Sequence, residues 1–280
     1  MRTLNVSEIV ENIKEMCIEA NHFLSDDMAQ AMKAAMDAEE APLGRQILGQ
    51  LKENMAIAGE DMIPICQDTG MAVVFLEVGQ EVHFEGGSLE EAVHEGVRRG
   101  YTEGFLRKSV VRDPIFRDNT NDNTPAVIHY NIVPGDKVRI TMAPKGFGSE
   151  NMSRIFMLKP ADGIEGVKNV VLATVKDAGP NACPPMVVGV GIGGTFEKCA
   201  LLAKRALTRP VNQRSETEYV RELEQELLEK INRSGIGPGG LGGSTTALAV
   251  NVETYPTHIA GLPVAVNICC HVNRHVVREL

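Results

Sequence analysis

Cys183, in the sequence KDAGPNACPP, is the residue whose local sequence most clearly suggests a functional side chain. A helix is predicted over Ile164–Ala178, and the pair Gly179-Pro180 ends it because proline cannot continue helical hydrogen bonding. Cys183 then lies in a bend stiffened by prolines, before an apolar strand expected over Met186–Val190. A thiol in such a bend is held in position for chemistry, whereas core cysteines usually lie inside regular elements.

Two further cysteines lie at comparable positions. Cys66 precedes polar residues and a turn glycine in CQDTG, and Cys270 follows an apolar strand expected over Leu262–Ile268. Three thiolates that converge from separate segments suit an iron–sulfur cluster with one iron unligated, and such an iron can act as a Lewis acid. From residue types alone, zinc bound by a Cys/His set is an alternative, and a buried thiol beside a turn is another interpretation of Cys66.

The remaining cysteines are expected to be structural. Cys17 lies on the apolar face of a predicted helix and Cys199 lies inside another, which is typical of core residues. The chain has six cysteines but no CxxC motif, and the only close pair is Cys269-Cys270. This spacing favours neither a zinc motif nor a disulfide framework.

The composition excludes several classes of function. The 280 residues are 43% hydrophobic and 23% charged, as in an ordinary globular protein. A net charge of −9, the absence of a basic run and an aromatic content of 4% argue against a nucleic-acid surface. No apolar run approaches the roughly 20 residues of a membrane span. The N-terminus resembles no signal peptide, so we expect a cytoplasmic protein.

Apolar periodicity predicts an α+β fold, with a helical N-terminal part and then sheets flanked by helices. Helical spacing covers residues 7–23, 25–36 and 42–58. The sequences at 126–133 and 137–143, on either side of Pro134-Gly135-Asp136, are expected to pair as a β-hairpin.

A second group of predictions concerns charges and glycines near the expected site. A capping box at Ser88–Glu91 opens a helix expected to reach about Arg107, whose charge suits a helix C-terminus. Gly146 and Gly148, in KGFGSEN, lie where backbone amides could bind a carboxylate or phosphate. The spacing GxGxGG at 189–194 is not that of a dinucleotide-binding fingerprint, so a nucleotide cofactor is not expected.

Four ordered motifs resemble those of a known family. They are CQDTG at 66–70, KDAGPNACPP at 176–185, GIGPGGLGG at 235–243 and CCHVNRH at 269–275. Together they resemble the α subunit of iron–sulfur hydro-lyases, the class I fumarate hydratase and L-tartrate dehydratase family, over essentially the whole chain. The resemblance implies a single catalytic region, residues 1–280, with two lobes of about 1–160 and 161–280 as a finer expectation.

The resemblance also implies a cofactor and site residues. The family carries an oxygen-sensitive [4Fe–4S] cluster on three cysteines. These match Cys66, Cys183 and Cys270, the last preferred to Cys269 for its spacing to His258 and Arg274. The positions implied to contact substrate or take part in catalysis are Gln67, Asp68, Arg107, Gly146, Gly148 and His258.

Single-chain relatives carry a second domain that supplies further substrate-binding groups and a catalytic base, and no such region is seen here. We therefore expect a separate β subunit, with α2β2 as the family-like assembly. The expected reaction is the reversible hydration of fumarate to L-malate. L-tartrate dehydratase and methylfumarate hydratase are the alternatives within the family. A non-catalytic iron-binding redox or regulatory subunit is an alternative of another class.

Overall fold

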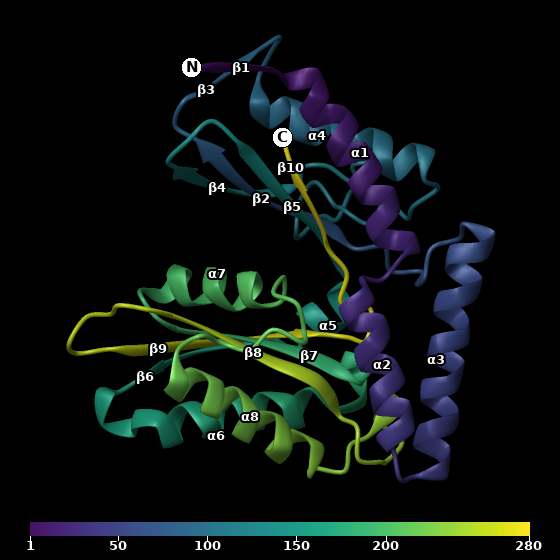
Figure 1. The fold of residues 1–280 in the computed structure, drawn as a ribbon, viewed down its shortest axis with the longest axis vertical. Helices are drawn as coiled ribbons and strands as arrows, with labels where there is room; N and C mark the ends of the chain where they lie inside the picture. The colour runs from purple at the N-terminus through teal and green to yellow at the C-terminus, as the bar shows by residue number, and fades with distance from the viewer. The chain divides into compact units, whose positions relative to one another are not determined.

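The computed structural model of the chain describes residues 1–280, which fold into two compact units (Figure 1). Unit 1 contains Met1–Ser25, Met55–Phe147 and Arg274–Leu280, and unit 2 contains Asp26–Asn54 and Gly148–Asn273. Each unit is therefore assembled from segments that are distant in sequence. The predicted α+β class, with helices first and sheets flanked by helices, is confirmed.

Unit 1 consists of a four-stranded sheet with helices on one face and a small two-stranded sheet. Its elements are β1 (Arg2–Asn5), α1 (Val6–His22), β2 (Met71–Gly79), β3 (Val82–Glu85), α4 (Leu89–Glu103), β4 (Val127–Val133), β5 (Val138–Lys145) and β10 (Val276–Glu279). Alternate residues of β2, from Ala72 to Val78, pack with buried residues of α1 and α4 in one core. This period of two places the opposite set of side chains on the other face of the sheet.

The predicted β-hairpin is wrong, although both of its strands exist. The strand order is β10-β5-β2-β4, so β2 lies between β4 and β5 and pairs parallel with one and antiparallel with the other. The turn at 134–136 instead passes over the end of β2, where the Gly79 amide donates to the Lys137 carbonyl at 2.8 Å. The strongly apolar β2 is buried along most of its length and is paired on both edges, between β4 and β5.

Unit 2 is a three-layer arrangement around a second sheet, of strand order β6-β9-β7-β8 (Figure 1). One face is covered by α7 and the other by α6 and α8, whose apolar residues form one core with the strands. The elements are α2 (Asp26–Ala38), β6 (Arg154–Leu158), η1 (Pro160–Asp162), α6 (Gly163–Ala178), η2 (Gly179–Ala182), β7 (Met186–Gly193), α7 (Phe196–Ala206), α8 (Glu218–Asn232), η3 (Pro238–Gly240), β8 (Ala247–Tyr255) and β9 (Leu262–Cys269). Two helices, α3 (Pro42–Asp61) and α5 (Phe147–Glu150), contain residues of both units.

The glycines of β7 explain why the GxGxGG sequence needs no nucleotide. A Cβ atom on Gly189 would lie 2.2 Å from the Ala203 carbonyl oxygen, and one on Gly191 would lie 2.1 Å from that of Cys199. Only glycine allows the backbone of α7 to lie this close to the strand. The glycines therefore serve helix–sheet packing, in agreement with the rejection of a dinucleotide site.

No helix of the structure combines the length and the apolar character that crossing a membrane requires. This holds for the long α3, whose charged residues recur along its length.

Candidate active site

The segment Cys66–Gly70 joins α3 to β2 and is fastened to unit 1 through its backbone. The Tyr101 hydroxyl, buried beneath the segment, donates to the carbonyls of Thr69 at 2.8 Å and Gly70 at 3.0 Å. The Asn123 side chain donates to the same Gly70 carbonyl at 3.2 Å. Burial raises the pKa of the Tyr101 hydroxyl, so this group remains a donor across the physiological range. The segment is therefore fixed before any ligand binds.

The carboxylate of Asp68 is held by backbone amides. Its Oδ1 accepts from the Gly70 amide at 3.0 Å, and its Oδ2 accepts from the Phe147 amide at 2.8 Å. A Cβ atom on Gly146 would lie 3.1 Å from Oδ2, so glycine gives the carboxylate room at this point. In this loop the Phe147 amide thus binds a carboxylate of the chain itself, and substrate contacts of Gly146 and Gly148 stay a prediction.

Arg274 is a buried cation for which the sequence predicts no role of its own. Its side chain is 4% exposed and donates to the backbone carbonyl of Asp68 and, at 3.4 Å, to that of Pro144. Its Nη1 is buried and has no hydrogen-bond partner in the structure. No local pattern connects residues 68 and 274, so this contact could not be found from the sequence.

The side chains of Gln67 and Arg107 are exposed beside this segment. Gln67 Oε1 lies 3.4 Å from the Cys66 sulfur, and the Arg107 carbonyl accepts from the Thr69 hydroxyl at 3.1 Å. The prediction that the helix reaches Arg107 is wrong, since α4 ends at Glu103 and Phe105 has a left-handed φ of 52°. Arg107 is therefore a loop residue, and a helix-dipole role does not account for it.

Cys183 and Cys270 are brought together at one end of the unit 2 sheet. Cys183 ends the short helix η2 with a left-handed φ of 51°, a conformation that costs a residue with a side chain about 1 kcal/mol. Its carbonyl accepts from the ring Nδ1 of His271 at 2.9 Å and from the His271 amide at 3.4 Å. The bend that carries Cys183 is thus tied to the residue next to Cys270.

The glycine-dense segment 234–243 supports the Cys183 bend from the other side. The Gly239 amide donates to the Pro184 carbonyl at 2.9 Å, and Gly240 packs against the Pro180 ring. Beyond these glycines, the amides of Ser244 and Thr245 donate to the fully buried carboxylate of Glu39 at 2.8 to 3.1 Å. The close approaches that these glycines allow are therefore to Pro180 and to Glu39.

We expect Glu39→Gln to destabilise unit 2 in a pH-dependent way. Burial raises the pKa of the Glu39 carboxyl, but hydrogen bonds from the amides of Ser244 and Ala41 outweigh it and lower the pKa from 4.5 to about 2. A depressed pKa stabilises the fold above the unfolded-state value, by about 3 kcal/mol here. The difference in free energy of unfolding between wild type and variant should therefore be full at pH 7 and shrink as the pH falls from about 4.5 to about 2.

Urea unfolding at several pH values measures this difference, and Glu40→Gln, at the exposed neighbouring position, is the matched control. A Glu39 effect that is equal at pH 7 and pH 3 would show that the carboxylate charge contributes nothing.

The accessibility of the six cysteines separates them into two sets. Cys183 is exposed and Cys66 and Cys270 are partly exposed, whereas the other three, Cys17, Cys199 and Cys269, are buried. Burial raises the pKa of the thiols of Cys17 and Cys199, which suits inert core residues. The accessible set is the one that the motifs assign to the cofactor, and Cys270 rather than Cys269 belongs to it.

The surroundings of these three accessible thiols suit ligands of an iron–sulfur cluster better than residues of the hydrophobic core. The backbone amide of Asp68 donates to the Cys66 sulfur at 3.4 Å, the kind of hydrogen bond that tunes cluster thiolates. Cys66 belongs to unit 1, and Cys183 and Cys270 belong to unit 2. Neither unit alone contains three Cys, His, Asp or Glu side chains grouped as a metal site.

Two of the predicted site residues, His258 and Gly148, make no contact that supports their predicted roles. His258 is exposed in the loop between β8 and β9, where its Nδ1 accepts from the Ala260 amide at 3.2 Å. Cys270 follows the far end of β9, and a strand of 8 residues spans about 26 Å. Within unit 2 the structure therefore does not bring His258 together with Cys183 and Cys270. A Cβ atom on Gly148 would meet no atom within 4 Å, so no close approach explains this glycine.

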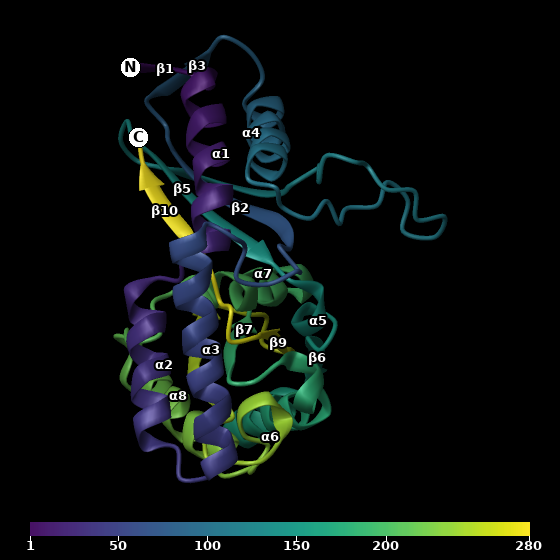
Figure 2. The same cartoon turned by 90° about the vertical axis from the view of Figure 1, so that its right-hand side faces the viewer.

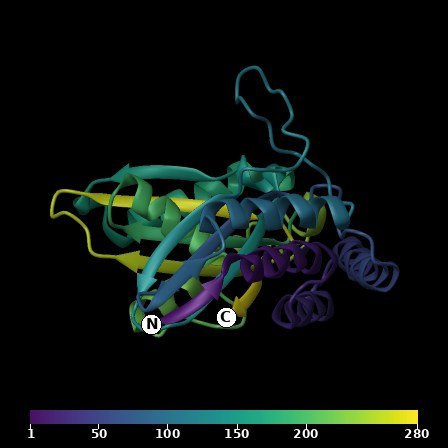
Figure 3. The same ribbon diagram turned by 90° about the horizontal axis from the view of Figure 1, so that it is seen from above.

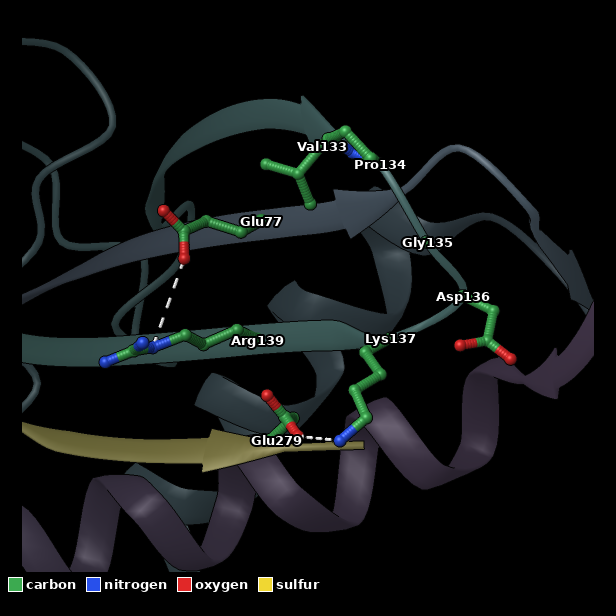
Figure 4. A pocket seen from close by; sticks show the side chains of 8 residues that line it. All are labelled: Glu77, Val133, Pro134, Gly135, Asp136, Lys137, Arg139 and Glu279. Atoms are coloured by element: carbon green, nitrogen blue, oxygen red, sulfur yellow. Dashed lines mark hydrogen bonds and ion pairs between the residues drawn. The ribbon is translucent and has the colours of Figure 1, made fainter.

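A cavity of about 320 Å³ in unit 1 lies away from these residues (Figure 4). It lies beside the turn at 133–137, where β2 ends, whereas Asp68 precedes the start of β2. Figure 4 shows its charges paired across strands: Glu77 with Arg139 at 4.0 Å, and Lys137 with Glu279. Both cations of the cavity are paired and the remaining charge, Asp136, is an acid, so the cavity offers no uncompensated cation for a dicarboxylate.

Comparison with known proteins identifies the family of this chain. The sequence model of the family described as fumarate hydratase (Fumerase) matches residues 10–279. The chain is 41% identical to the "Putative L(+)-tartrate dehydratase subunit alpha" of Methanocaldococcus jannaschii, over 98% of both chains. It is 34% identical to the L(+)-tartrate dehydratase subunit alpha of Escherichia coli (strain UTI89 / UPEC), over 96% of this chain and 88% of that one. The chain therefore belongs to this hydro-lyase α-subunit family.

Proposed function

We propose that the chain is the α subunit of a fumarate hydratase, which adds water reversibly to fumarate to give L-malate. The observation that carries the proposal is the fixed carboxylate of Asp68, two residues from an accessible thiol at Cys66. Membership of the fumarate hydratase family supports the reaction class. In this proposal Cys183 and Cys270 of unit 2 act together with the residues of unit 1.

The cofactor that we propose for this enzyme is a [4Fe–4S] cluster held by Cys66, Cys183 and Cys270. When bound, such a cluster supplies one iron without a cysteine ligand, which acts as a Lewis acid toward a hydroxyl and its adjacent carboxylate. The accessibility of all three cysteines and the amide directed at the Cys66 sulfur support this assignment. An oxygen-sensitive cluster suits a reducing compartment, so a cytoplasmic location is part of the proposal.

The chain's own residues bind the substrate and move one proton. Arg107, whose side chain is exposed and makes no ion pair, binds a carboxylate through two parallel hydrogen bonds. The Gly146 backbone, beside the Asp68 carboxylate, is a better second contact than Gly148. In the hydration direction the Asp68 carboxylate accepts a proton from the water whose oxygen bonds to carbon; in the dehydration direction the carbon–oxygen bond breaks and Asp68 returns that proton to the departing hydroxyl, while Gln67 orients the substrate. A base on the partner removes the proton from the adjacent carbon.

The partner protein that we propose for this chain is a β subunit. The relatives above are each named as a subunit alpha, which supports a heteromeric enzyme, and α2β2 is the assembly we propose. A catalytic role of His258 stays a prediction, since its position near the start of β9 gives it no contact with Cys183 or Cys270.

L-tartrate dehydratase is the second candidate, because relatives of 41% and 34% identity carry that name. Steady-state assay of the anaerobically assembled α and β subunits on fumarate, L-malate and L-tartrate distinguishes the two. We expect the highest kcat/KM on fumarate. A higher kcat/KM on L-tartrate would replace the first candidate by the second, and activity on none of the three would refute both.

Arg107→Ala should raise the KM for dicarboxylates by about 10- to 100-fold, the effect of losing a charge-assisted bidentate contact. Arg107→Lys should fall between wild type and Arg107→Ala, because lysine keeps the charge but not the paired geometry. The measurement is steady-state kinetics together with cluster absorbance, which should be unchanged in both variants. An unchanged KM in Arg107→Ala would remove the residue from the binding site.

A further inference from the structure

An arm extends from unit 1 between α4 and β4, and we define it as residues 108–123. In Figures 2 and 3 it extends away from the helices and sheet of this unit. Its tip carries Ile115 and Phe116, with 79% and 81% of their surface exposed. Adjacent apolar side chains at the end of a projecting loop are typical of a protein interface, since nothing within the unit covers them.

The arm is ordered by its own hydrogen bonds. The Asp113 Oδ1 atom accepts from the amides of Ile115 and Phe116, both at 2.8 Å, which fixes the turn at the tip. Lower down, the Arg112 amide donates to the Asp118 carbonyl at 2.7 Å. The two apolar side chains are therefore held outward in advance, which reduces the entropy lost when a partner binds them.

The base of the arm is fastened to the segment that carries Asp68. Asn123 is fully buried, and its Oδ1 accepts from the amides of Ser109 at 2.7 Å and Val110 at 3.2 Å. Its Nδ2 donates to the Gly70 carbonyl at 3.2 Å. Each side of the arm has eight residues and spans at most about 29 Å, so a protein bound to the tip lies within about that distance of the segment that carries Asp68.

We infer that the arm is the docking element for the β subunit, which receives Ile115 and Phe116 in an apolar pocket. The inference rests on the proposed function, since it names the surface through which the partner completes the site. The charges next to the tip, Arg112 and Asp113 on one side and Arg117 and Asp118 on the other, have both signs. They suit a mixed polar rim on a protein partner rather than an anionic lipid surface.

The test measures α–β association without cluster or substrate, by analytical ultracentrifugation of the full-length subunits. Phe116→Ser and the double variant Ile115→Ser/Phe116→Ser should weaken binding at least about 10-fold, as expected for an interface anchor. Phe196→Ser is the matched control, since Phe196 is a 60% exposed phenylalanine at the start of α7. The control should bind as wild type does, and thermal unfolding of all variants should be unchanged because the tip has no contact to lose.

The outcomes separate this inference from the function on which it rests. If wild-type α binds no β subunit, the heteromeric enzyme itself is refuted. If wild type binds and the arm variants bind within twofold of it, only the docking role is refuted. Loss of self-association of α with α–β binding intact would assign the arm to a second copy of this chain and would equally overturn the inference.

Discussion

Cys183→Ser should abolish the iron–sulfur cluster, and Cys66→Ser and Cys270→Ser should do the same. Changes beside a metal ligand already lower metal affinity by about 10- to 100-fold, so the loss of a ligand should lower iron and sulfide content at least as much. The measurement is iron and sulfide analysis with visible absorbance, after anaerobic reconstitution of α together with β.

The neighbouring cysteine provides the control for this series. Cys269→Ala changes a thiol that is 4% exposed and adjacent to Cys270, so it should keep full iron and sulfide content. Cluster loss in Cys269→Ala with full content in Cys270→Ser would reverse the assignment of the pair. Full content in Cys183→Ser would remove that residue from the ligand set.

Asp68→Asn should lower kcat by about 10²- to 10⁴-fold, the range over which a positioned proton donor accelerates a reaction. Asparagine keeps an acceptor for only one of the Gly70 and Phe147 amides, but the hydrogen bonds from Tyr101 and Asn123 to the segment's backbone remain and should keep its conformation. It cannot supply the carboxyl proton, and the loss should therefore appear in kcat with cluster absorbance unchanged.

Asp136→Asn, at an exposed position in the turn beyond β2, should leave kcat as in wild type. A normal kcat in Asp68→Asn would show that the proton comes from another group, and its assignment to this chain would fail.

Local features were predictable because they depend on neighbours in sequence. The helix at α6, the bend around Cys183 and the apolar strand after it follow from proline, glycine and apolar spacing, and the structure has all three. Cys270 could be preferred to Cys269 only by motif, and the alternation of side chains at the end of β9 now gives the physical reason.

The errors and omissions involve contacts between distant segments. Nothing in the sequence around Pro134 shows that β2 separates the two strands on either side, so a hairpin was the natural prediction. The end of α4 before Arg107 is a local exception: it is followed by a left-handed Phe105, a conformation that this residue type does not signal. No pattern in the sequence marks Glu39 as buried, because its carboxylate binds amides some 200 residues away.

The most direct test of the central claim is the metal and sulfide content of the assembled enzyme, reconstituted without oxygen. A cluster on Cys66, Cys183 and Cys270 predicts about four iron and four sulfide atoms per α chain, with absorbance that air removes. Zinc without sulfide, or iron content that does not depend on these three cysteines, would contradict the account.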